Sequence, residues 1–155
     1  MGAERMERSG RKGLVVACLA VLGACGDATG VVSAPIELER ARGLWDARGV
    51  QDYRMTVRLT GAWIGGAAEI QVRGGVPVSV RPVGLPEGIP AEAFRDYDTV
   101  EELFAILQHA VDNDAERIAA EYHPRLGVPV EVSIDHRLTT ADDEHGFIVE
   151  AFDVQ

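Results

Sequence analysis

The chain has 155 residues, of which 46% are hydrophobic and 26% are charged, and its 25 acidic residues outnumber its 15 basic ones. This length corresponds to about one domain, and the net charge of −10 argues against nucleic acids and anionic lipid surfaces as electrostatic partners, because both repel an acidic protein.

The first 24 residues have the composition of an export signal. Residues 1–13 carry four basic and two acidic residues, and an apolar run follows over 14–22. A basic start favours the cytoplasmic side of a membrane, and the run is about half as long as a membrane-spanning helix. We therefore expect residues 1–24 to be a signal peptide rather than a membrane anchor.

Residues 21–26, VLGACG, have the pattern of a lipobox. Leu22 lies three positions before Cys25, and two small residues between them give a peptidase access to the backbone. The freed thiol of Cys25 would then accept a lipid, so we expect a lipid bilayer as partner and a cell-envelope location. That location is the outer face of the cytoplasmic membrane or the outer membrane. The alternative is an ordinary secretory signal with a chance cysteine at the cleavage site.

After cleavage, residues 25–155 would keep 11 basic residues, all arginine, and 23 acidic ones, for a net charge of −12. Cys18 leaves with the leader and Cys25 takes the lipid, so no thiol remains for a disulfide, a nucleophile or a metal site. Residues 25–34 have short side chains and no periodicity, which is typical of a flexible tether. We expect one domain over 35–155, stabilised by its apolar core.

The domain is expected to begin with a helix. Pro35 suits a first helical turn, and Gly49 offers a stop. Three apolar residues lie between them on one helical face: Leu38, Ala41 and Trp45. This spacing predicts that Trp45 is a core residue rather than a platform for a ligand.

Three strands and a connection are expected next. Alternating apolar residues indicate strands over 53–60, 68–72 and 76–80. Gly74 and Gly75 suit a tight turn between the last two strands. Residues 82–98 are rich in proline and glycine and predict a long connection. Three apolar residues are expected to hold it to the body of the domain: Ile89, Phe94 and Tyr97.

The second half repeats this order. Thr99 and Glu102 have capping-box spacing, and a continuous apolar stripe predicts a helix over 100–111. Alternation then indicates two strands joined by a hairpin at 123–127, and a last strand over 147–152 whose register stays open because it is apolar on both faces. The order predicts an α+β fold, an antiparallel sheet of about six strands with two helices packed on one side.

Four segments in this order resemble a family of exported bacterial lipoproteins built around a small domain of unknown function. They are 41–49 (ARGLWDARG) with 52–54 (DYR), 99–104 (TVEELF), 122–129 (YHPRLGVP) with 134–135 (ID), and 141–147 (ADDEHGF). The resemblance covers about 41–152. It implies an envelope location and this type of fold, and it implies no established activity. Members often carry cysteines in the loop after the first strand, whereas residues 60–66 contain none, so no disulfide or metal role transfers to that loop.

Carboxylates and imidazoles bracket one loop near the end of the chain. They are Asp135, His136, Asp142, Asp143, Glu144 and His145. The four carboxylates could converge on a divalent cation, since hard cations prefer oxygen ligands. Their spacing matches neither the calcium loop of helix-loop-helix proteins nor a zinc-hydrolase helix. The sequence favours the structural alternative, in which Asp side chains bond the backbone amides of their own loop.

Trp63 and Ile64 lie in a glycine-flanked loop over 61–66 and are candidate contacts for a partner, because exposed apolar residues at loop tips often meet one. The alternative is that the loop packs back onto the sheet. The sequence has no serine elbow, phosphate loop or mature thiol. It therefore predicts a non-catalytic domain that has no cofactor. This domain is expected to bind an envelope protein or a small ligand. The rival prediction is a metal-binding or metal-dependent protein that uses residues 135–145.

Overall fold

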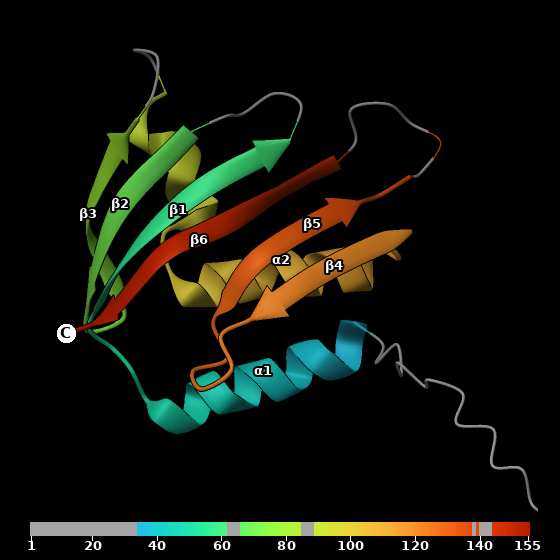
Figure 1. The fold of residues 1–155 in the computed structure, drawn as a ribbon, viewed down its shortest axis with the longest axis horizontal. Coiled ribbons are helices and arrows are strands. Elements are labelled where there is room, and N and C mark those ends of the chain that lie inside the picture. The colour runs from blue at the N-terminus through green and yellow to red at the C-terminus, as the bar shows by residue number, and fades with distance from the viewer. Residues whose placement is uncertain (1–33, 62–65, 85–88, 138, 140–143) are drawn as a thin grey trace, which may run out of the picture. The chain divides into compact units, whose positions relative to one another are not determined.

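The computed structural model describes residues 34–61, 66–84, 89–137, 139 and 144–155. These residues form two α-helices, one 3₁₀ helix and six strands (Figure 1). In chain order the elements are α1 (Ala34–Arg48), β1 (Tyr53–Gly61), β2 (Gly66–Arg73), β3 (Val76–Val83), η1 (Ala91–Tyr97), α2 (Val100–Asp112), β4 (Arg117–Tyr122), β5 (Pro129–Asp135) and β6 (Glu144–Val154). The predicted order of helices and strands is confirmed, with η1 as an addition.

The six strands form one antiparallel sheet in the order β3-β2-β1-β6-β5-β4. Two three-stranded meanders are joined at the centre, where β1 pairs with β6. Helices η1 and α2 lie on one side of the sheet, and α1 packs against α2 and the edge strand β4 (Figure 1). The predicted α+β class, with an antiparallel sheet and helices on one side, is confirmed.

The core lies between this sheet and the helices. Every second residue of β1 is buried, as the alternation predicted: Tyr53, Met55, Val57 and Leu59. The apolar stripe of α2 is buried against them: Val100, Leu103, Phe104, Leu107 and Ala110. The alternate residues of β1 point to the other face of the sheet, because side chains change sides at each residue of a strand. The second face of the sheet is left mainly to polar residues, with a few apolar ones such as the exposed Val76.

Trp45 is a core residue, as predicted. Its side chain is 3% exposed, and its indole nitrogen donates a hydrogen bond to the Oε1 of Glu101, 3.0 Å away. Its ring packs edge-to-face against Tyr53 and Phe152, with centroids 5.6 and 6.0 Å apart. Trp45 therefore ties α1 to the start of α2 and to the two central strands.

A β-bulge sets the register of β6, which the sequence left open. Thr56 pairs with Ala151 and Val57 pairs with Val149, so Glu150 is an extra residue on β6. The bulge shifts the alternation by one residue. As a result Phe152 packs on Tyr53 in the same core as the residues before the bulge, at a centroid distance of 5.1 Å. The strand is also longer than the predicted 147–152, because its ends pair with β1 and β5.

The segment predicted as a connection over 82–98 contains a helix. Helix η1 buries Phe94 completely, and Tyr97 packs edge-to-face on Phe147 at 5.9 Å. The expected anchoring of the segment is confirmed, and the connection also contains a short helix that the sequence did not predict. A 3₁₀ helix is too short to show the apolar periodicity by which longer helices are recognised in a sequence.

Two side chains cap the start of α2. The hydroxyl of Thr99 accepts a hydrogen bond from the Glu102 amide at 3.1 Å, as its capping-box spacing predicted. The hydroxyl of Tyr53 accepts a second, buried hydrogen bond from the Val100 amide at 2.9 Å. Burial raises the pKa of this phenol, so it stays protonated. A strand residue therefore satisfies one of the four amides that a helix start leaves unpaired.

Tyr53→Phe should lower the free energy of unfolding by about 1–3 kcal/mol, because it keeps the ring but leaves the buried Val100 amide without an acceptor. Chemical denaturation followed by circular dichroism measures the change. Tyr122→Phe is the matched control, since the half-buried Tyr122 makes no side-chain hydrogen bond in the described part of the chain. Equal losses in the two variants would contradict a capping role for Tyr53.

Candidate functional site

The face of the sheet opposite the helices is polar and divides into two halves of opposite charge. The strand registers place these side chains on one face. The half made by β1–β3 carries one carboxylate, Glu69, and four arginines: Arg54, Arg58, Arg73 and Arg81. The half made by β4–β6 carries one arginine, Arg117, and six carboxylates: Glu121, Glu131, Asp135, Glu144, Glu150 and Asp153. We call this surface the open face.

Three of the four arginines on the β1–β3 half are paired with carboxylates. The Nε of Arg58 lies 2.6 Å from the Oε1 of Glu150 across the boundary between the halves. Arg73 pairs with Asp52 at 3.9 Å, and Arg81 pairs with Glu69. All these side chains are 38–64% exposed, so the pairs contribute little to stability. They do neutralise three arginines.

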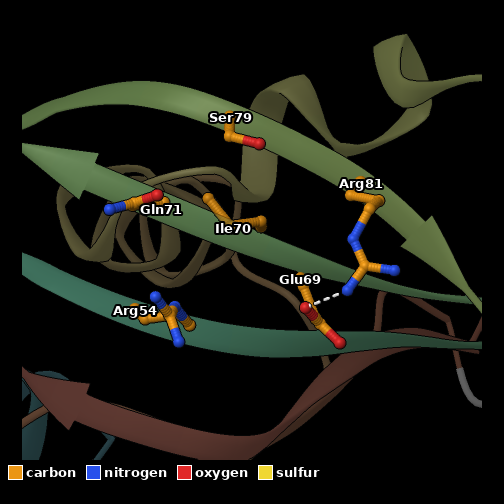
Figure 2. Close-up of a pocket in the computed structure, with 6 residues that line it drawn as sticks. All are labelled: Arg54, Glu69, Ile70, Gln71, Ser79 and Arg81. Carbon is orange, nitrogen blue, oxygen red and sulfur yellow. Dashed lines mark hydrogen bonds and ion pairs between the residues drawn. The ribbon is translucent and has the colours of Figure 1, made fainter.

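A depression of about 300 Å³ lies within the β1–β3 half of the open face. Its lining residues are Arg54, Glu69, Ile70, Gln71, Ser79 and Arg81 (Figure 2). Figure 2 shows the guanidinium of Arg81 on β3 reaching to Glu69 on the neighbouring strand β2. The depression is therefore polar and presents side chains from three neighbouring strands.

Strand pairing aligns three of the lining side chains. Arg54 on β1 lies opposite Gln71 on β2, and Gln71 lies opposite Ser79 on β3. We call these three residues the polar row. Guanidinium and amide groups donate hydrogen bonds, and a hydroxyl can donate or accept one. The three side chains together can therefore bind a polar group of a ligand by hydrogen bonds.

The polar row is not among the sites that the sequence predicted. Its members come from three strands, and which residues lie side by side depends on the register. A partial signal was available, since polar residues alternate with apolar ones along β1 and β2. That alternation predicts an outward face and does not say which outward residues are neighbours.

The structure describes two of the four carboxylates that the sequence offered as candidate ligands for a divalent cation. Asp135 on β5 lies opposite Glu144 on β6. The Oδ1 of Asp135 accepts a hydrogen bond from the Arg137 amide at 3.0 Å, and the Oε1 of Glu144 accepts one from the Ser133 hydroxyl at 2.7 Å. The Asp135 bond is of the kind that the structural alternative predicted.

Asp142 and Asp143 lie outside the described residues. Within the ranges that are described, no group of three or more His, Cys, Asp or Glu side chains is arranged to hold a metal ion. Because two of the four candidate ligands are not among those residues, cation binding by residues 135–145 stays the rival prediction.

Three of the four histidines line one groove. A space of about 270 Å³ between η1, α2, β5 and β6 is bordered by His109, His136 and His145. The rings of His136 and His145 stack with centroids 5.3 Å apart. The fourth, His123, has a structural role, since its Nδ1 accepts hydrogen bonds from the backbone amides of Arg125 and Leu126 in the β4–β5 hairpin.

The remaining predicted site residues fall on parts of the chain that are not described. These are Cys25 at the predicted lipidation site and Trp63 and Ile64 in the loop between β1 and β2. Lipidation and a partner contact at that loop stay predictions. In the ranges that the structure covers, the helices lack the combination of length and apolar character needed to cross a membrane.

Comparison with known families places the domain in a family. A model described as a family of unknown function, DUF6174, matches residues 37–154. Among curated proteins, none matches this chain. The matched segment takes up most of the chain and contains nearly all of the fold, from the first turn of α1 to the end of β6. The chain therefore belongs to DUF6174, a family of unknown function.

Proposed function

We propose that this protein is a lipid-anchored lipoprotein of the cell envelope, and that its DUF6174 domain binds a partner or a small ligand without catalysing a reaction. The observation that carries the binding role is the open face, where polar side chains line a depression and helices cover only the opposite side. A sheet face that is not needed for the core is free to evolve as a binding surface. The proposed ligand is an envelope protein or a small molecule.

The anchoring part of the proposal rests on the residues that precede the domain. The family match begins at residue 37, after the basic start, the apolar run and the lipobox. Cleavage before Cys25 would leave a tether of nine residues before α1, with a reach of at most about 30 Å. The domain would thus stay close to the membrane surface, where its ligand is expected. Its acidic composition would limit non-specific adhesion to anionic lipids.

The anchoring proposal predicts that Cys25→Ala moves the protein from the detergent phase to the aqueous phase in a Triton X-114 partition of expressing bacterial cells. The physical reason is that acyl chains supply the membrane affinity, at about 0.8 kcal/mol for each buried CH₂ group. Mass spectrometry of the wild-type chain should find acyl groups on an N-terminal Cys25.

Cys18→Ala is the matched control, because it removes the other cysteine, seven positions earlier in the apolar run. This variant should partition like the wild type. If wild-type protein stays in the aqueous phase and carries no acyl group, the lipoprotein assignment is wrong.

A further inference from the structure

We propose that the polar row, Arg54, Gln71 and Ser79, binds a carboxylate group of the ligand. This inference rests on the proposed binding role of the open face and names the chemistry that the face recognises. Arg54 makes no ion pair and no side-chain hydrogen bond in the residues that the structure describes. The other three arginines of that half each have a carboxylate partner.

Arg54 lacks a carboxylate partner in the described residues, although carboxylates are plentiful in this acidic chain. Residues 25–155 contain 23 acidic residues and 11 arginines, so carboxylates are about twice as common as the arginines that could pair with them. Asp153 on β6 even lies directly opposite Arg54 in the register. The two side chains nevertheless form no ion pair within the described ranges. Arg54 is therefore available to a carboxylate from outside the chain.

The neighbours of Arg54 are suited to the same ligand. Gln71 and Ser79 also make no side-chain hydrogen bond in the part of the chain that is described, and both line the depression with Arg54 (Figure 2). Neighbouring strands are about 4.8 Å apart, so the polar row spans about 10 Å. A planar guanidinium can hold both oxygens of a carboxylate in a fork. The Gln71 amide and the Ser79 hydroxyl can donate to the lone pairs that remain.

Charge favours a carboxylate over a phosphate. The depression contains two arginines and the carboxylate of Glu69, and Asp153 lies beside its edge. Glu69 already neutralises Arg81, so Arg54 supplies one positive charge that the lining does not balance. A carboxylate monoanion matches that single charge, whereas a phosphate dianion would leave one negative charge uncompensated beside an acidic domain. The ligand group is therefore a single carboxylate, carried either by a peptide or by a small organic acid.

The test is an NMR titration of the whole chain in nonionic detergent micelles, where binding can be measured whether or not Cys25 carries lipid. The side-chain NH signals of Arg54 and Gln71 are followed. The probes are sodium acetate, N-acetyl-Ala-Ala with a free carboxylate, the same dipeptide as its amide, inorganic phosphate and sodium chloride, all at equal ionic strength. We expect saturable shifts with acetate and with the free-acid dipeptide.

Two arginine variants separate the polar row from general electrostatics. Arg54→Gln should weaken carboxylate binding at least about tenfold, the equivalent of one charge-assisted hydrogen bond. Arg58→Gln removes the same charge from the same face of β1 and should change the affinity less than about twofold. Backbone spectra that match the wild type show that both variants fold.

The possible sources of the carboxylate give different supporting results. Tighter binding of the dipeptide acid than of acetate indicates a peptide ligand, and equal binding indicates a small acid. The proposal is overturned if neither acetate nor the free-acid dipeptide gives a saturable shift, or if the dipeptide amide or chloride gives the same shifts as these carboxylates. It is also overturned if phosphate binds more tightly than the carboxylates, or if Arg58→Gln weakens carboxylate binding as much as Arg54→Gln. Any of these outcomes would leave the partition result for Cys25 unaffected. Failure of the carboxylate proposal is therefore distinguishable from failure of the proposed lipid anchoring.

Discussion

Phe104→Ala should lower the free energy of unfolding by about 3–5 kcal/mol, the usual cost of truncating a buried phenylalanine. Phe104 lies in the middle of the buried stripe of α2 and is 2% exposed. The guanidinium of Arg42 on α1 lies 5.3 Å from the centre of its ring, so the substitution also removes a cation–π contact between the two helices. This loss is a large share of the about 5–15 kcal/mol that stabilise a typical domain.

Urea denaturation followed by circular dichroism measures this loss. His109→Ala is the control on the same helix, because His109 is exposed and an exposed substitution changes stability by about 0.5 kcal/mol or less. A loss below about 1 kcal/mol in Phe104→Ala would mean that α2 does not present this face to the sheet.

Gly127→Ala should lower the free energy of unfolding by about 2–5 kcal/mol, for two separate reasons. Gly127 has a φ of +78°, in the left-handed region that disfavours side chains. A Cβ at this position would also lie 2.1 Å from the carbonyl oxygen of Ala41 and 3.0 Å from the Cβ of Leu44. The absence of a side chain is therefore what lets the β4–β5 hairpin pack against α1.

Gly74→Ala separates the two reasons. Gly74 also has a positive φ, +56°, but a Cβ there would meet nothing within 4 Å. The control therefore carries the backbone strain of about 1–2 kcal/mol without the clash. The free energies of unfolding of the two variants, measured from denaturation curves, should differ by the cost of displacing the hairpin from α1. Equal losses would contradict the close packing of Gly127 on that helix.

The sequence by itself determined the order of the two α-helices and the six strands, and the class of fold. Apolar alternation identified β1, and the stripe of α2 identified which face of that helix is buried. Thr99 was recognised as a cap because its acceptor role depends on spacing within four residues. These features are local, since the periods of a strand and of a helix are expressed by residues close together in the chain.

Only the tertiary structure decided the register and the candidate site. β1 and β6 pair across residues about 90 positions apart, and the bulge at Glu150 arises from that pairing. The polar row depends on the same kind of information, because Arg54, Gln71 and Ser79 become neighbours only when β1, β2 and β3 pair in one particular register. Outward residues of a strand are equivalent in the sequence pattern, and a shift of the register would give each of them different neighbours. Alternation along the chain could therefore predict that Arg54 faces outward, while its neighbours and its lack of a carboxylate partner were decided by the packing of strands across the sheet.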